Sequence, residues 1–171
     1  MKLAHYFPYF IIAIILSCTK PPDYPIEPNI EYQSISSNTM IQGDLNTDST
    51  VVTISFTDGD GDLGNNDTLF DIFVKDIRIP DVPGINPIQY KMPFVPIQGV
   101  GNGISGEISI LTYNTCCIYP PGTFSPCDES EAATSAFPTD TLIYEIYIKD
   151  RAGNESNRVL TNPIILQCDV N

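Results

Sequence analysis

Beyond Asn29, apolar and polar residues alternate with a period of two along much of the chain. Two runs, 51–56 and 142–149, show this alternation most clearly. Their apolar positions are Val52, Ile54 and Phe56 in the first run, and Leu142, Tyr144, Ile146 and Ile148 in the second. Because successive side chains of a β-strand point to opposite faces, each run predicts a strand with one buried face.

Five further runs have a strand-like composition, and none has apolar residues at helical spacing. These runs are 30–36, 69–79, 88–96, 106–113 and 158–166. The 15 prolines and 11 glycines lie mostly between the runs, where turns need them. About seven short strands separated by turn signals predict an all-β domain over residues 30–171, folded as an antiparallel β-sandwich.

Segment 115–141 interrupts this rhythm, because it contains three cysteines, four prolines and the acidic run 128–131. It is longer than an ordinary hairpin loop. We therefore expect an insertion between the fifth and sixth strands, stapled by a disulfide. A loop of this length either binds a partner or only decorates the domain.

The first 17 residues predict a secretory signal peptide. Lys2 precedes the apolar run 7–16, which leads into Ser17 and Cys18. The arrangement resembles the lipobox of bacterial lipoproteins, in which the cysteine left by cleavage carries a diacylglycerol on its sulfur. About ten apolar residues are too few for a transmembrane anchor, which needs roughly twenty. We expect Cys18 to be lipidated and to anchor a cell-envelope protein in the outer membrane. The domain could lie on the periplasmic or on the surface side of that membrane.

Residues 18–29 predict a tether between the lipid and the domain. Four prolines fall within positions 19–28. Proline at this density removes backbone donors and favours an extended, semi-rigid chain. The segment is therefore expected to act as a spacer rather than as part of the fold.

Charge and histidine content restrict the function. Cleavage would remove Lys2 and leave 154 residues with seven basic and 21 acidic side chains, a formal charge of −14. Such a surface repels nucleic acid and favours metal cations or basic partners. The only histidine, His5, is also removed. Without histidine the mature chain cannot form a Ser-His-Asp or Cys-His nucleophile, or a zinc or copper site with histidine ligands.

Four cysteines remain beside Cys18, namely Cys116, Cys117, Cys127 and Cys168. An even number in an exported chain predicts disulfides. A bond between Cys116 and Cys117 would close a strained eight-membered ring. We expect one of these neighbours to pair with Cys127 and the other with Cys168, and the choice between them stays open. A thiolate metal cluster is the alternative, although no C-x-x-C spacing is present.

Carboxylates and glycines alternate in the run 58–64, which reads Asp-Gly-Asp-Gly-Asp-Leu-Gly. Asp58, Asp60 and Asp62 supply the hard oxygen ligands that calcium prefers, on a loop that glycine lets curl around an ion. The spacing begins like an EF-hand but departs from it twice. Leu63 stands at the position of the turn glycine and Leu69 at that of the bidentate glutamate.

Calcium takes six to eight oxygens, so three carboxylates need further ligands. In an immunoglobulin-like sandwich the loops after the second and sixth strands cluster at one end, which would bring Asp150 and Asn154 to the aspartate loop. We expect these five residues to bind calcium in a structural role. Asp76 follows a strand that runs away from this end. The alternative is that the aspartates only form turns.

Three segments resemble a family of bacterial cell-envelope lipoproteins with an immunoglobulin-like domain and no assigned activity. They are 56–64, 95–99 and 144–157, of which the aspartate loop and the Asp-Arg-Ala-Gly-Asn loop are the most specific. The last segment is also similar to the closing strands of bacterial immunoglobulin-like and fibronectin-type domains. The resemblance covers residues 18–171 and implies the fold and the location but no substrate. The cysteine-bearing insertion departs from the family pattern.

The function expected from these features is that of a non-catalytic, lipid-anchored binding or structural module with a protein or glycan ligand. The alternative is an accessory glycan-binding lipoprotein of a polysaccharide-uptake system. Such proteins use aromatic platforms, and in this chain, which lacks tryptophan, Tyr90, Tyr113 and Tyr119 would have to supply them. A glycosidase is not expected, because solvated aspartates beside glycines are poor general acids.

Overall fold

A computed structural model describes residues 23–96 and 103–169. Within these residues the chain is nearly all β, with ten strands and one short helix. The elements are β1 (Asn29–Ile35), β2 (Thr39–Ile41), β3 (Ser49–Asp58), β4 (Ile72–Asp76), β5 (Ile88–Tyr90), β6 (Ile104–Tyr113), α1 (Glu131–Ala136), β7 (Thr139–Leu142), β8 (Tyr144–Ile148), β9 (Val159–Leu160) and β10 (Ile164–Gln167). The predicted signal peptide and Cys18 lie outside the described residues.

The strands form three sheets, with the orders β1-β3-β6, β2-β10-β7 and β5-β4-β8-β9. The longest pairing joins β3 and β6 over ten residues in antiparallel register, with Ile54 opposite Ile108. All the strand pairs are antiparallel except β2 with β10, which is parallel. The strands are therefore largely antiparallel, as predicted, with one exception at β2.

The chain changes sheets in the middle of runs that the sequence presents as continuous. Predicted strand 142–149 is the end of β7 followed by β8, with Ile143 between them in neither strand. The run 158–166 is similarly divided into β9 and β10, separated by a stretch containing Pro163, which cannot donate a ladder hydrogen bond. Only Ile88–Tyr90 of run 88–96 is a strand. The three-residue β2 was not predicted.

A single core joins the three sheets. The buried apolar side chains come from strands of every sheet: Ile30, Met40, Val52, Ile54, Ile72, Val74, Ile110, Leu142, Tyr144, Ile146, Ile148, Ile164 and Leu166. All four residues predicted for the buried face of run 142–149 are in this core, and Phe56 packs against its edge half-buried. Each fully buried side chain of this size contributes roughly 1.5–3 kcal/mol, so the alternation in the sequence also locates the main stabilising contacts.

Two disulfides confirm the predicted disulfide bonding: Cys116–Cys127 closes a loop within the insertion, and Cys117–Cys168 ties the insertion to the segment after β10. Its unpredicted helix α1 begins after Ser130, whose side chain accepts a hydrogen bond from the backbone N–H of Ala133. Helix capping by serine explains why a helix starts there without an apolar stripe along the sequence.

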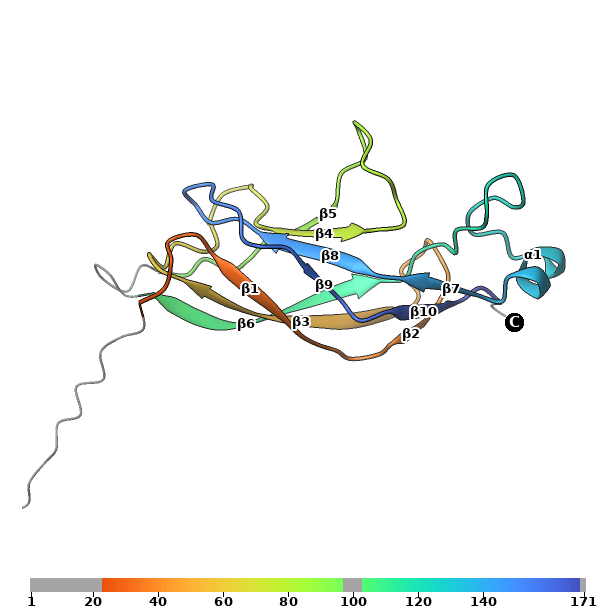
Figure 1. Cartoon of the computed structure of the whole chain (residues 1–171), viewed down its shortest axis with the longest axis horizontal. Coiled ribbons are helices and arrows are strands. Elements are labelled where there is room, and N and C mark those ends of the chain that lie inside the picture. The colour runs from red at the N-terminus through yellow and green to blue at the C-terminus, as the bar shows by residue number, and fades with distance from the viewer. Residues whose placement is uncertain (1–22, 97–102, 170–171) are drawn as a thin grey trace, which may run out of the picture.

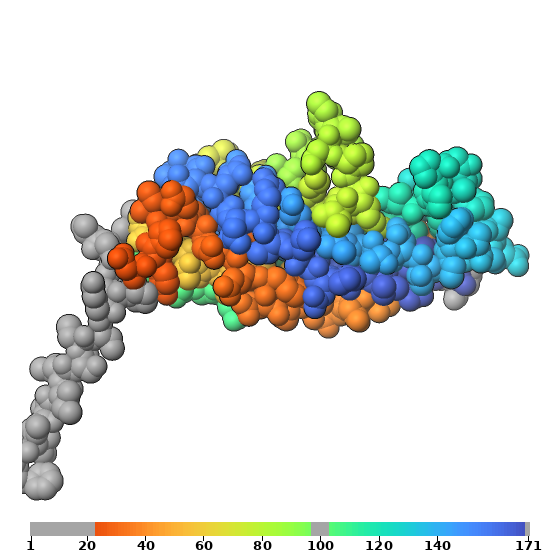
Figure 2. Space-filling model, in the orientation of Figure 1, coloured from red at the N-terminus to blue at the C-terminus, as the bar shows by residue number. Residues whose placement is uncertain are grey.

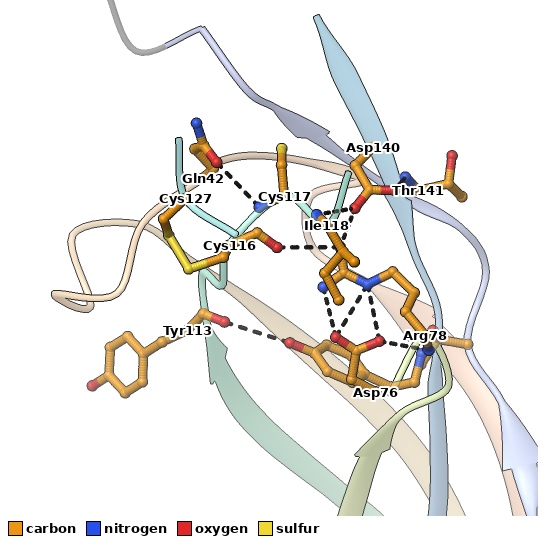
Figure 3. A network of polar contacts seen from close by, with 12 residues as sticks. Gln42, Asp76, Arg78, Tyr113, Cys116, Cys117, Ile118, Cys127, Asp140 and Thr141 are labelled. Carbon is orange, nitrogen blue, oxygen red and sulfur yellow. Dashed lines mark hydrogen bonds and ion pairs between the residues drawn. A yellow bond between two sulfur atoms is a disulfide. The ribbon is translucent and has the colours of Figure 1, made fainter. Parts of the chain in front are cut away.

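Arg78 connects the insertion to β4 (Figure 3). Its guanidinium lies between the carboxylates of Asp76, at 2.6 Å, and Asp140, at 2.5 Å. It also donates to the carbonyl oxygen of Cys116. The side chain of Arg78 is only 11% exposed, so removing either carboxylate would leave part of a buried charge unpaired.

The two ends of the domain differ in content (Figure 1). The loops that follow β3 and β8 lie at the end where the described chain begins, and the insertion with α1 lies at the opposite end. The loop between β4 and β5 stands away from the body of the domain, as the yellow-green lobe in Figure 2 shows. The only helix among the described residues is far too short to cross a membrane.

Candidate metal centre

Four aspartates from two loops meet at one end of the domain. Asp58 is the last residue of β3, Asp60 and Asp62 follow it, and Asp150 comes two residues after β8. One carboxylate oxygen from each of the four lies within 4.8 Å of the others. The predicted approach of the two loops is thus observed, although β3 and β8 belong to different sheets.

Glycine is required at two positions of the aspartate loop. A Cβ atom on Gly59 would lie 2.3 Å from the carbonyl oxygen of Tyr24, where the end of the tether packs against the loop. Gly64 has a φ of +68°, and a Cβ atom there would lie 2.1 Å from the carbonyl oxygen of Pro93. Side chains at either position would push these backbones apart, so the glycines permit the close packing that shapes the loop.

In Asp58 and Asp62, one carboxylate oxygen is oriented by a hydrogen bond from a backbone amide. Oδ2 of Asp58 accepts a hydrogen bond from the N–H of Asp62 at 2.9 Å. Oδ2 of Asp62 accepts one from the N–H of Ala152 at 3.1 Å. The second oxygens, Oδ1 of Asp58 and Oδ1 of Asp62, are buried and have no hydrogen-bond partner. Buried polar atoms are nearly always paired, and these two oxygens are free to accept a cation.

Arg151 holds the two loops together. Its Nη1 donates to the carbonyl oxygens of Leu63 at 3.0 Å, Gly64 at 2.7 Å and Val95 at 3.2 Å. Its guanidinium lies over the ring of Phe94, 4.8 Å from the centroid. These contacts fix the distance between Asp62 and the β8–β9 loop, because the Arg151 N–H also donates to the carbonyl of Asp62.

Asn154 positions Asp150. Its backbone N–H donates to Oδ1 of Asp150 and its Nδ2 donates to Oδ2 of the same carboxylate, both at 2.7 Å. The amide of Asn154 therefore presents a donor to Asp150 in this structure. Its predicted part as a direct ligand stays a prediction, while its contact with the site is observed.

The electrostatics of the cluster are unfavourable without a cation. Burial, and to a smaller extent the carboxylates of Asp60, Asp62 and Asp150, raise the pKa of Asp58 to about 6, against a backbone hydrogen bond from Asp62 that lowers it. Burial also raises the pKa of Asp62, with Asp150 and Asp60 adding to the effect and Arg151 opposing it. A divalent ion would offset both the burial and the mutual repulsion.

Next to the aspartate loop, Asn65 and Asp71 form a polar contact. The sequence did not indicate this contact. Asp71 is buried and accepts hydrogen bonds from Asn65 Nδ2 and from the N–H of Met92. The backbone N–H of Lys149 donates to the carbonyl oxygen of Asp71 at 2.8 Å. These contacts tie the segment after the aspartate loop to the residue that follows β8. By contrast, Asp76 is paired with Arg78 away from the cluster, as its strand direction predicted.

A second candidate site is a cavity of about 530 Å³ under the β4–β5 loop. Tyr90 and Tyr113, two of the tyrosines considered as glycan platforms, line it. Tyr119 does not, because it is buried in the insertion against Phe124 and Phe137. Nothing in the sequence indicated the cavity, since its walls come from segments far apart in the chain.

Comparison with known proteins gives no match: no family model, curated protein or solved structure is significantly similar to this chain. The geometry and charge of the two sites therefore carry the functional argument.

Proposed function

We propose that this protein is a non-catalytic, lipid-anchored module of the cell envelope, whose binding loops are held in shape by a calcium ion. The lipid is attached at Cys18, in the outer membrane, and the domain is an immunoglobulin-like or fibronectin-type β-sandwich. The meeting of the loops after β3 and β8 at one end supports this fold, because such sandwiches gather their loops in this way.

The observation that carries the calcium proposal is the pair of unpartnered, buried carboxylate oxygens within the four-aspartate cluster. Asp58 has no solvent-exposed surface, yet its Oδ1 has no hydrogen-bond partner. An ionised carboxylate in this position needs a cation. Asp60 and Asp62 would supply further hard oxygen ligands, and calcium accepts such ligands in variable number and geometry.

Calcium would act here as a structural ion. The four carboxylates come from the aspartate loop and the β8–β9 loop, and the tether packs against Gly59 of the aspartate loop. An ion that binds only the folded state raises stability by mass action. Binding would therefore fix the loops relative to each other and to the tether.

Calorimetric titration of the mature chain, with Cys18→Ser to omit the lipid, tests this proposal. We expect one calcium per chain, and the variant Asp60→Asn with Asp62→Asn should lose the binding heat. Asp44→Asn, an exposed charge outside the cluster, is the matched control and should bind as wild type does. A wild-type chain that binds no calcium at millimolar concentration would return these aspartates to a turn-forming role.

The second candidate function is glycan binding, as in accessory lipoproteins of polysaccharide uptake. The specific observation in its favour is the cavity of about 530 Å³, into which Tyr90 and Tyr113 both project part of their surface. Its volume falls within the range of small-ligand sites, roughly 300–1,000 Å³.

A further inference from the structure

The cavity lies between the β4–β5 loop and the strands that this loop covers. Its walls include β4, β5, the end of β6 and the first residue of β8. Tyr144 forms part of the inner wall and is itself fully buried, with its hydroxyl 3.5 Å from the carbonyl oxygen of Tyr113. The inner surface is therefore fixed by the core, and the outer wall is a proline-rich loop that stands away from the body (Figure 2).

Polar side chains without partners line this cavity. The hydroxyls of Tyr90 and Tyr113 and the side-chain amides of Asn46 and Asn86 make no hydrogen bond with any of the described residues. Each hydroxyl can both donate and accept, and each amide offers two donors and an acceptor. Apolar side chains such as Ile85 also line the cavity. The lining thus combines aromatic and aliphatic faces with free hydrogen-bonding groups.

The charged side chains that line the cavity are all held in ion pairs. The carboxylate of Asp76 is paired with Arg78 (Figure 3), at 2.6 Å between Oδ2 and Nη2. Lys75 is paired with Asp81, also at 2.6 Å. Arg78 also pairs with Asp140, so this group keeps one excess negative charge, and the chain as a whole is strongly acidic. Both features disfavour an anionic ligand. These features favour an uncharged ligand.

We propose that this cavity binds a neutral sugar ring of an oligosaccharide. This proposal rests on glycan binding, the second candidate function above. A pyranose ring has an apolar C–H face, which packs on aromatic side chains, and a rim of hydroxyls, which pair with phenol and amide groups. Tyr90 and Tyr113 supply the aromatic contacts and the hydroxyls. Asn46 and Asn86, from separate loops, bind the rim of the ring.

The test is a calorimetric and NMR titration of the mature chain carrying Cys18→Ser. The probes are neutral hexasaccharides of glucose, mannose and xylose, with a galacturonic acid hexamer and a proline-rich decapeptide for comparison. Tyr90→Phe and Tyr113→Phe remove one hydroxyl each and keep the ring. Tyr147→Phe is the matched control, because Tyr147 stacks on Phe73 outside this cavity and keeps that contact as phenylalanine.

We expect at least one neutral hexasaccharide to bind, with amide shifts concentrated at Val74, Asn86 and Thr115 of the cavity wall. Tyr90→Phe and Tyr113→Phe should each weaken binding by roughly three- to tenfold, the effect of losing one hydrogen bond. Tyr147→Phe should bind as wild type does. The chemical-shift changes of the wild-type chain locate the binding site without the variants, so this test remains valid if a variant is poorly folded.

Absence of binding by every neutral probe, shifts at other residues, or preferential binding of the acidic hexamer or the peptide would overturn the proposal. A calcium titration of the same samples separates this result from the calcium proposal. Calcium binding without sugar binding removes only the cavity proposal, and sugar binding without calcium binding removes only the metal site.

Discussion

Replacing Asp58 with asparagine should stabilise the calcium-free domain at neutral pH. Burial and three neighbouring carboxylates raise the pKa of Asp58 from 3.8 to about 6, so the folded state binds its proton more tightly than the unfolded state does. The stabilising contribution of this proton is fully present below pH 3.8 and is lost as the pH rises through about 6. Asparagine is neutral throughout, and its Oδ1 can still accept the hydrogen bond from Asp62.

The magnitude follows from the pKa of Asp58. A rise from 3.8 to about 6 is close to two pH units, and one unit corresponds to about 1.4 kcal/mol. The site lies at the end of the domain, where solvent screens part of the repulsion, so we expect about 1–3 kcal/mol at pH 7.5. For a chain of this size, such an increase in the free energy of unfolding raises the melting temperature by roughly 3–10 °C.

The assay is thermal and urea unfolding of the mature chain with chelator at pH 4, 5, 6 and 7.5. The difference in free energy of unfolding between Asp58→Asn and wild type should grow from pH 4 to 7.5. With millimolar calcium the order should reverse, because wild type gains stability from the ion and the variant loses a central ligand.

Asp44→Asn serves as the control for a change of net charge and should show neither effect. A variant that is less stable than wild type in chelator at every pH would refute the reasoning, since it would mean that the ionised carboxylate stabilises the loop. A difference that does not change between pH 4 and 7.5 would show that Asp58 does not titrate in this range.

Three further outcomes are expected. Arg151→Met removes hydrogen bonds to three carbonyl oxygens, so it should lower the free energy of unfolding by about 2–4 kcal/mol and weaken calcium binding. Unchanged urea unfolding and calcium affinity would contradict the role given to Arg151. Cys117→Ser together with Cys168→Ser removes the disulfide whose cysteines are 51 residues apart, and should lower the free energy of unfolding in urea by about 4 kcal/mol. Removing the other disulfide, with a separation of 11 residues, should cost about 3 kcal/mol. An equal or opposite ranking would count against loop closure as the cause. Cys18→Ala should move the protein from the membrane to the soluble fraction on cell fractionation, and an unchanged distribution would disprove lipid anchoring.

Local patterns were sufficient to predict most of the strands and the buried face of the clearest ones. The alternation in 142–149 correctly identified Leu142, Tyr144, Ile146 and Ile148 as core residues, because a strand's period of two is a property of its own backbone. The same pattern does not reveal that the chain changes sheets at Ile143. The change depends on which strands pair with each half, and those partners are distant in sequence.

The aspartate cluster was predictable in part. Alternating aspartates and glycines identify a loop suited to a cation, and the order of the strands brought Asp150 to it. The helix in the insertion escaped prediction because it contains only six residues and begins at a serine cap rather than along an apolar stripe. Short elements of this kind are selected by their surroundings more than by their own sequence.

The sequence by itself determined the β-rich class, the disulfide bonding and the carboxylates of the candidate metal site, since each follows from residue type and local spacing. Only the tertiary structure revealed that Arg151 holds two loops together through three carbonyl oxygens, and that Asn154 positions Asp150. It also created the cavity between Tyr90 and Tyr113. These features are contacts between segments far apart in the chain, and such contacts arise only when packing of the core fixes where each loop lies.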